Sequence, residues 1–148
     1  MRRSIALLTL LVASILTSCD HGSGGLGLSI GPWVRIVGFI EPALPPSSSL
    51  VVPDTVHAGT VFTATVVTYG GTGCLRPIES GVQTVGSQIE ITAYDLIWTG
   101  STCPADWHPY PRSVQLRLSA AGAAVIRLHG RQPPDSAVTI ERAITVLP

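Results

Sequence analysis

Apolar and polar residues alternate along most of the chain after position 32, in short runs that end at glycine or proline. The clearest run extends from Thr60 to Tyr69, where Phe62, Ala64 and Val66 are separated by threonines. Strict alternation over several residues is typical of a β-strand with one buried face. We therefore expect a strand here, with the three apolar side chains directed into a core.

The same pattern predicts further strands in the rest of the chain. They cover Val34–Ile40, an edge segment at Leu50–Val52 and Val56, Val82–Val85, Gln88–Trp98, Ser113–Ser119, Ala123–His129 and Ala137–Leu147. Thr99–Pro111 is expected to be a loop. Two charged residues, Glu141 and Arg142, interrupt the last alternation, so we expect a β-bulge there.

Seven or eight short strands in about 115 residues, joined by turns and without a convincing helix, predict an all-β fold. We expect an antiparallel sandwich, with a barrel as the rival architecture. The spacing, with long loops early and tight hairpins late, resembles that of the immunoglobulin-like domains common in bacterial surface and periplasmic proteins. The Cys-Trp-Cys core signature of antibody domains does not occur in this sequence.

The first residues have the pattern of a secretory signal. Arg2 and Arg3 precede a mostly apolar run from Ile5 to Leu16. That run of about 12 residues is shorter than the roughly 20 that a membrane-spanning helix needs, and it has the length of a signal-peptide core. We therefore expect residues 1–18 to be a cleaved signal peptide.

The run ends in Leu16-Thr17-Ser18-Cys19, which resembles the lipobox of bacterial lipoproteins. The resemblance implies a diacylglycerol on the Cys19 thiol, cleavage before Cys19 and acylation of the new amine. Two or three acyl chains would hold the protein at a membrane, whereas one chain binds only reversibly. The alternative is an ordinary secretory signal, whose A-x-A cleavage pattern Ser18-Cys19-Asp20 matches poorly.

Glycine and serine dominate residues 20–32, a composition typical of a flexible tether. The predicted organisation is a signal peptide at 1–18, a lipidated cysteine and tether at 19–32, and one domain at 33–148. Localisation would then be the bacterial cell envelope, with a membrane as partner through Cys19.

The cysteine count predicts a crosslink. With Cys19 lipidated, Cys74 and Cys103 remain as an even pair in an oxidising compartment. A disulfide between them would close a loop of about 30 residues, worth roughly 3–4 kcal/mol by the chain-entropy model. A redox or metal-thiolate pair would have closer spacing.

Composition and charge limit the classes of protein and partner that the sequence allows. Hydrophobic residues make up 45% and charged residues 12%, which excludes a wholly disordered chain. All nine basic residues are arginines. Without Arg2 and Arg3 the net charge is about −2, and no basic cluster indicates nucleic-acid binding.

The sequence shows no recognisable catalytic or metal centre. The four histidines, His21, His57, His108 and His129, have no metal-ligand spacing. A Gly-x-Ser-x-Gly motif does not occur, and the acidic residues are scattered singly. We therefore expect a protein that is not an enzyme and has no cofactor.

The least ordinary surface segment follows Cys103 and contains Trp107, His108, Tyr110 and Arg112. Such amphipathic residues dominate binding hot spots, so this is the candidate binding loop. In the alternative interpretation, Trp107 and Tyr110 fold back over the open end of the sandwich and cover its core.

These observations predict a membrane-anchored lipoprotein with a non-catalytic immunoglobulin-like interaction or structural domain, and an unidentified protein as partner. A small protease-inhibitor-like or adhesion module is the alternative. A hydrolase or metal-dependent enzyme on a sandwich scaffold is a third, disfavoured hypothesis, because no cluster of acids, bases or metal ligands can be named. The fold alone does not separate these hypotheses, because sandwiches host many functions.

Overall fold

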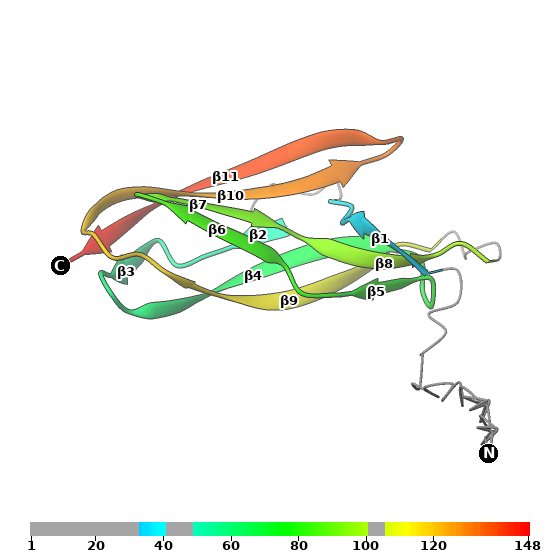
Figure 1. Cartoon of the computed structure of the whole chain (residues 1–148), viewed down its shortest axis with the longest axis horizontal. Coiled ribbons are helices and arrows are strands. Elements are labelled where there is room, and N and C mark those ends of the chain that lie inside the picture. The colour runs from blue at the N-terminus through cyan, green and yellow to red at the C-terminus, as the bar shows by residue number, and fades with distance from the viewer. Residues whose placement is uncertain (1–32, 41–48, 101–105) are drawn as a thin grey trace, which may run out of the picture.

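The computed structural model describes residues 33–40, 49–100 and 106–148 (Figure 1). These residues form eleven strands, so the fold is all-β as the alternation predicted. The strands are β1 (Trp33–Val37), β2 (Leu50–Val51), β3 (Thr55–His57), β4 (Val61–Gly70), β5 (Leu75–Pro77), β6 (Gly81–Val85), β7 (Gln88–Thr92), β8 (Tyr94–Trp98), β9 (His108–Arg117), β10 (Gly122–Gln132) and β11 (Ser136–Leu147).

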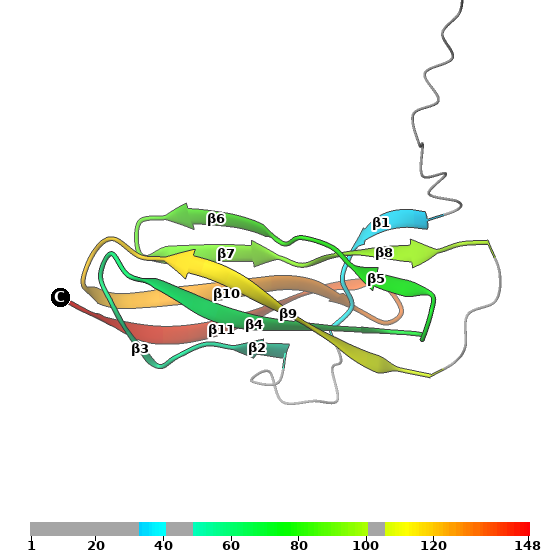
Figure 2. The ribbon, with the colours of Figure 1, turned by 90° about the horizontal axis from the view of Figure 1, so that it is seen from below.

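Backbone hydrogen bonds group the strands into three sheets, with the orders β3-β11-β10-β7-β6, β2-β4-β9 and β1-β8-β5. In Figure 1 the long hairpin of β10 and β11 lies along the upper side of the molecule, and β4 and β9 lie along the lower side. In the view from below in Figure 2 the two pairs overlap, so they form two layers. The third sheet lies towards the end of the molecule where β1 begins.

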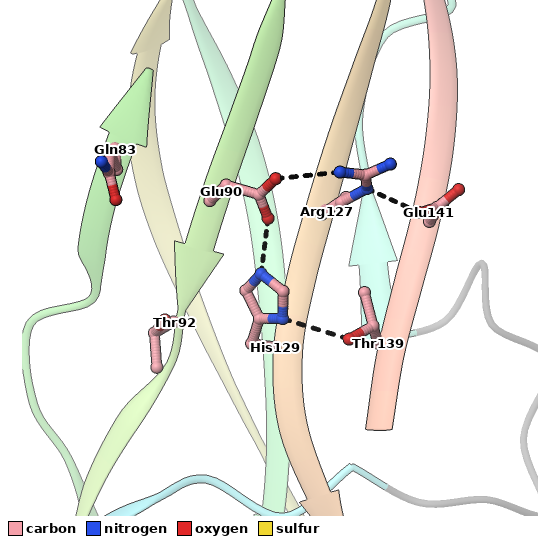
Figure 3. A pocket seen from close by; sticks show the side chains of 7 residues that line it. All are labelled: Gln83, Glu90, Thr92, Arg127, His129, Thr139 and Glu141. Atoms are coloured by element: carbon pink, nitrogen blue, oxygen red, sulfur yellow. Dashed lines mark hydrogen bonds and ion pairs between the residues drawn. The ribbon is translucent and has the colours of Figure 1, made fainter. Parts of the chain in front are cut away.

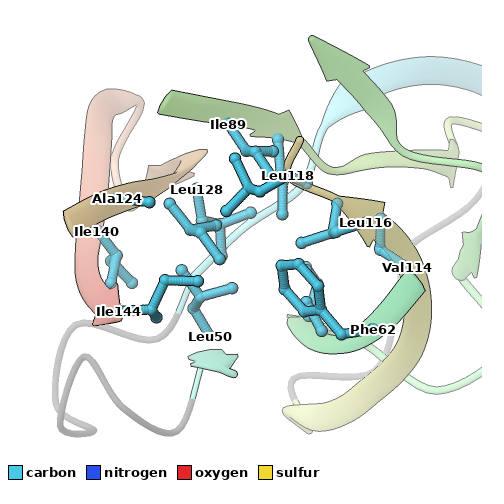
Figure 4. Packing of buried hydrophobic residues seen from close by; sticks show 14 of the residues in the cluster. Leu50, Phe62, Ile89, Val114, Leu116, Leu118, Ala124, Leu128, Ile140 and Ile144 are labelled. Carbon is cyan, nitrogen blue, oxygen red and sulfur yellow. The ribbon is translucent and has the colours of Figure 1, made fainter. Parts of the chain in front are cut away.

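The core fills the space between these layers (Figure 4). Phe62, Ala64 and Val66 of β4 are buried, which confirms the inward face predicted for that strand. They face apolar side chains of β10 and β11, including Leu128 and Ile144. Burying such side chains contributes about 1.5–3 kcal/mol each, so the alternation of β4 is also what holds the layers together.

The expected strand Gln88–Trp98 is two strands in different sheets. β7 pairs with β6 and β10, whereas β8 pairs with β1 and β5. The change occurs at Ala93, whose side chain is buried and whose carbonyl accepts a hydrogen bond from the Gly38 N–H at 2.8 Å. Buried and outward residues continue to alternate across Ala93. The outward residues of this one run therefore lie on the outer face of one sheet before Ala93 and on the outer face of the other sheet after it.

Two expectations about the sheets are wrong. The structure has eleven strands, more than the seven or eight expected, for three reasons. Gln88–Trp98 divides, the edge segment at Leu50–Val52 and Val56 forms two strands, and β5 forms in a segment expected to be irregular. The sheets are also not wholly antiparallel, since β7 runs parallel to β10 and β3 runs parallel to β11. Both parallel neighbours are distant in the sequence, so hairpin reasoning between consecutive strands could not identify them.

The bulge predicted at Glu141–Arg142 does not occur. The β10–β11 register is continuous, with Arg127 opposite Glu141 and Ile126 opposite Arg142. Glu141 points outward and accepts a hydrogen bond from Arg127 Nε at 2.6 Å. An opposite-charge cross-strand pair supports regular pairing, which is why the two charged residues are accommodated without an extra residue.

The expected loop Thr99–Pro111 ends earlier than predicted, because β9 begins at His108 and pairs there with Gly70 of β4. Pro109 and Pro111 lie within β9. Proline is tolerated at this position because β9 is the edge strand of its sheet. Within the described ranges, no helix has the length and apolar character needed to cross a membrane.

Candidate functional site

A hollow of about 650 Å³ opens on the outer face of β6, β7, β10 and β11 (Figure 3). Its lining is polar, because these are the outward residues of strands whose inward residues, such as Ile91 and Leu128, form the core. The lining residues are Gln83, Glu90, Thr92, Arg127, His129, Thr139 and Glu141.

Arg127 is the centre of an ion-pair cluster in the hollow. Its Nε donates to Glu141 Oε1 at 2.6 Å, and its Nη1 donates to Glu90 Oε1 and Gln88 Oε1, each at 3.2 Å. The hydrogen bond to Glu141, followed by that to Glu90, raises the pKa of Arg127. The guanidinium therefore holds three strands, β7, β10 and β11, in one arrangement.

His129 extends the cluster. Its Nε2 lies 2.5 Å from Glu90 Oε2 and its Nδ1 lies 3.1 Å from Thr139 Oγ1. The hydrogen bond to His129 is the largest cause of a lowered pKa for Glu90, with a further contribution from Arg127. Since an ionised carboxylate only accepts hydrogen bonds, Nε2 carries the proton, and the Thr139 hydroxyl can donate to Nδ1 of a neutral ring.

The line Thr139–His129–Glu90 has the connectivity of a hydroxyl–imidazole–carboxylate relay. Acyl transfer also needs donors that stabilise an oxyanion, which are commonly backbone N–H groups. The floor of the hollow is β10, which is hydrogen-bonded to β11 on one side and to β7 on the other over residues 125–129. Its backbone N–H groups are thus engaged in the sheet, and the hollow presents side-chain donors and acceptors suited to a polar ligand.

Sequence reasoning missed this cluster. It treated Glu90 and Glu141 as isolated acids and His129 as an isolated histidine. The available signal was the i, i+2 spacing of Arg127 and His129, and of Thr139 and Glu141, which places each pair on one face of a strand. What brings Glu90 to His129, 39 residues away, is the parallel pairing of β7 with β10.

Arg112, predicted to belong to a binding loop, points into the protein instead. Its side chain is 10% exposed and forms an ion pair with Asp95, whose side chain is fully buried. Nη1 donates to the carbonyls of Ile78 at 2.9 Å and Tyr94 at 2.5 Å, and Nη2 also contacts the Thr68 hydroxyl. Arg112 therefore connects β9 to β4 and β8 and does not form part of an exposed rim.

Burial of Asp95 raises the pKa of its carboxyl, and the opposing attraction of Arg112 is smaller. Gly38 packs directly over this carboxyl. A Cβ at position 38 would lie 2.5 Å from Thr68 Cγ2 and 2.6 Å from Asp95 Oδ2. The chain therefore needs glycine at position 38 for the β1–β8 sheet to close over the ion pair.

The other residues of the candidate binding loop lie near the start of β9. Trp107 is 49% exposed and packs edge-on against Phe39, with 6.1 Å between ring centroids. His108 is exposed, and its Nε2 lies 2.9 Å from Asp106 Oδ2. Tyr110 is half-buried and donates to the Gly71 carbonyl at 3.3 Å. Trp107 therefore covers Phe39 with part of its ring and exposes the rest to solvent. Its position lies between the two interpretations of this segment, a binding loop and a cover for the core.

Asp106 joins this segment to the turn after β4. Its carboxylate accepts hydrogen bonds from the Thr72 hydroxyl at 2.6 Å and from the Thr72 N–H at 3.3 Å. The hydroxyl contact is the largest cause of the lowered pKa of Asp106. These contacts place the start of β9 beside the turn that leads to Cys74.

Cys74 is buried just before β5, and its carbonyl accepts a hydrogen bond from the Trp98 N–H at 2.9 Å. Cys19 and Cys103 lie outside the described residues. The lipidation of Cys19 and the pairing of Cys74 with Cys103 therefore remain predictions.

Among the described residues, no group of three or more His, Cys, Asp or Glu side chains is arranged to hold a metal ion. The chain matches no protein-family model, no curated protein and no solved structure.

Proposed function

We propose that this protein is a lipid-anchored component of a bacterial cell envelope that binds a polar partner at the Glu90–Arg127–His129 hollow. The observation that carries the binding role is the convergence of seven polar side chains from four strands on one exposed face. Sites built on paired strands hold their side chains in place better than sites on loops. The anchoring role comes from the signal and lipobox pattern that ends at Cys19.

The proposed domain is an immunoglobulin-like sandwich that acts without catalysis. Two layers, one with β4 and β9 and the other with β10 and β11, share one apolar core, which supports this assignment. The tight hairpin between β10 and β11 is a connection common in such domains.

The charges of the hollow indicate what it would bind. Arg127 is balanced by Glu90 and Glu141, and His129 also contacts Glu90. Because the charged groups already pair with each other, a highly charged ligand would have to displace them. A ligand rich in neutral hydrogen-bonding groups, such as an extended polar peptide segment, fits this surface better.

The anchor is tested by metabolic labelling with an alkyne fatty acid. The full-length protein is expected to incorporate the label, and Cys19→Ala is expected to lose it. Label retained in Cys19→Ala would contradict the lipobox interpretation.

The proposed Cys74–Cys103 bridge is tested by mass spectrometry of envelope material alkylated without reduction. We expect no alkylated cysteine at either position. Alkylation of both would refute the bridge and leave the anchor unaffected.

The binding role is tested with a photo-crosslinking amino acid placed in living cells at Gln83, which lines the hollow. The matched control carries it at Gln115, an exposed residue on the opposite layer whose amide donates to Thr63 at 2.9 Å. We expect an adduct from position 83 that disappears in Thr139→Val and Arg127→Gln. The same adducts from both positions, or none from position 83, would overturn the proposal.

A further inference from the structure

The outer face of the β1-β8-β5 sheet carries a second, chemically different surface. Trp33 lies opposite Trp98, and Arg35 lies opposite Leu96. Directly paired residues project to the same side of a sheet, and so do residues at i and i+2. The outward side chains include Trp33, Arg35, Arg76, Tyr94, Leu96 and Trp98, which we call the aromatic face.

Ring and guanidinium contacts organise the aromatic face. The rings of Trp33 and Trp98 meet edge to face with centroids 5.3 Å apart. Arg76 Cζ lies 4.3 Å from the Trp33 centroid, and Arg35 Cζ lies 3.7 Å from the Tyr94 centroid. Both arginines are exposed. A guanidinium stacked by its flat side keeps its N–H edge available for an oxyanion such as phosphate.

The aromatic face is positively charged. β1, β5 and β8 contain one acidic residue, Asp95. Its side chain is buried on the opposite side of the sheet, where it pairs with Arg112. Outside these strands, acidic residues nearby along the chain include Glu79, two positions after β5, and Glu41, four positions after β1. The face therefore combines two arginines with two tryptophans and a tyrosine, the residues that favour the headgroup region of a bilayer.

We propose that the aromatic face lies on an anionic membrane surface, with Arg35 and Arg76 on lipid phosphates and Trp33 and Trp98 among the headgroups. This inference rests on the lipid anchor proposed above, because β1 begins 14 positions after Cys19. The anchor would thus keep this face within reach of the bilayer.

The same strand run carries both surfaces, which meet at Tyr94, because Tyr94 also lines a smaller hollow with Glu90 and Thr92. Thr92 lines the hollow and Trp98 is six residues further along. At about 3.3 Å per residue this separates them by roughly 20 Å. Contact through the Trp33–Trp98 end therefore leaves the hollow open to a partner.

The test uses the native lipidated protein reconstituted into vesicles that contain brominated lipid, which quenches tryptophan fluorescence. One set is phosphatidylcholine alone and the other includes phosphatidylglycerol. We expect stronger quenching with phosphatidylglycerol, reduced by salt and abolished in Arg35→Gln/Arg76→Gln. The Arg35→Lys/Arg76→Lys variant keeps the charge and should retain most of the effect. Arg117→Gln, an exposed arginine on β9, is the matched control.

Equal quenching in both vesicle types, or an equal loss in Arg117→Gln, would overturn the inference. Vesicle flotation distinguishes failure of this inference from failure of the lipid anchor. If the protein floats with the vesicles but its quenching does not depend on the lipid, the anchor holds and the proposed contact of the aromatic face with the membrane is contradicted. If the protein does not float, cosedimentation with phosphatidylglycerol vesicles decides the inference without the anchor. Two arginines near an anionic surface should then change partitioning by roughly tenfold or more between wild type and the double glutamine variant.

Discussion

Two arginine–carboxylate networks lie on opposite sides of the Gln88–Trp98 run. On the outer side, Glu90 binds Arg127 and His129, and the side chains of Glu90 and Arg127 are 26% and 32% exposed. On the inner side, Asp95 binds Arg112, and the carboxylate is fully buried. The chemical groups are nearly the same, and the difference between the networks is access to water.

That difference reverses the effect on the carboxyl groups. Burial raises the pKa of Asp95 because lost hydration outweighs the attraction of Arg112. The pKa of Glu90 is lowered because His129 and Arg127 donate to it while it remains partly hydrated. The buried network therefore joins sheets at a cost in solvation, and the exposed network keeps an ionised, adaptable surface available for binding.

Breaking the buried network should have the largest effect. Arg112→Met removes the partner of Asp95 and is expected to lower the free energy of unfolding by about 3–5 kcal/mol. Urea denaturation of the two proteins measures the difference. The matched control is Arg117→Met, an exposed position on the same strand, expected to change stability by less than about 0.5 kcal/mol. Similar losses of unfolding free energy in the two variants would contradict the prediction that the buried ion pair contributes more than an exposed arginine.

Replacing both partners should restore most of this loss. In Arg112→Met/Asp95→Leu neither side chain leaves a buried charge, and apolar replacements of buried pairs are often neutral or stabilising. We expect the double variant to lie within about 2 kcal/mol of wild type, part of the remainder reflecting the lost partner of Thr68. If the double variant is as unstable as Arg112→Met, the loss of stability comes mainly from lost packing and not from the unpaired charge of Asp95.

Trp107 offers an intermediate case between a buried and an exposed contact. It is 49% exposed and its edge-on contact is with Phe39. Such an aromatic contact is worth about 0.5–1.5 kcal/mol beyond area burial. We expect Trp107→Ala to cost about 1–2 kcal/mol in a thermal or urea melt, and Trp107→Phe to recover part of it. A loss of about 3–5 kcal/mol would indicate a true core residue.

Breaking the exposed network should have a small effect on stability. Arg127→Gln removes contacts to Glu141 and Glu90, and exposed ion pairs contribute about 0–1 kcal/mol. We expect a change below about 1 kcal/mol by urea denaturation, together with loss of the photo-crosslinked adduct. A loss comparable with that of Arg112→Met would contradict the assignment of the cluster to binding.

The pH dependence of stability should have opposite signs for the two carboxyls. The folded pKa of Asp95 is raised above 3.8, so its contribution to stability falls as pH rises through that folded value. The folded pKa of Glu90 is lowered below 4.5, so its contribution is present above 4.5 and is lost as pH falls through the folded value.

Denaturation of wild type, Asp95→Asn and Glu90→Gln between about pH 3 and pH 7 measures these contributions. On acidification, the stability of wild type should increase relative to Asp95→Asn and decrease relative to Glu90→Gln. Changes of the same sign in both comparisons would contradict the opposite pKa shifts.

Local alternation determined several strands from the sequence alone. Thr60–Tyr69 was predicted and β4 occupies Val61–Gly70, with the expected residues buried. This works because successive side chains of a strand face opposite sides, so one buried face appears directly in the sequence. The signal and lipobox pattern ending at Cys19 is likewise a local feature, which stays a prediction.

Tertiary structure decided which strands became neighbours and which side chains met. Ala93 divides Gln88–Trp98 between two sheets, although alternation continues across it. Parallel pairing of β7 with β10 brings Glu90 to His129, and the seam between β4, β8 and β9 turns Arg112 inward onto Asp95. Period-2 alternation specifies a buried face but not the partner strand, because pairing between distant strands depends on packing of the whole domain.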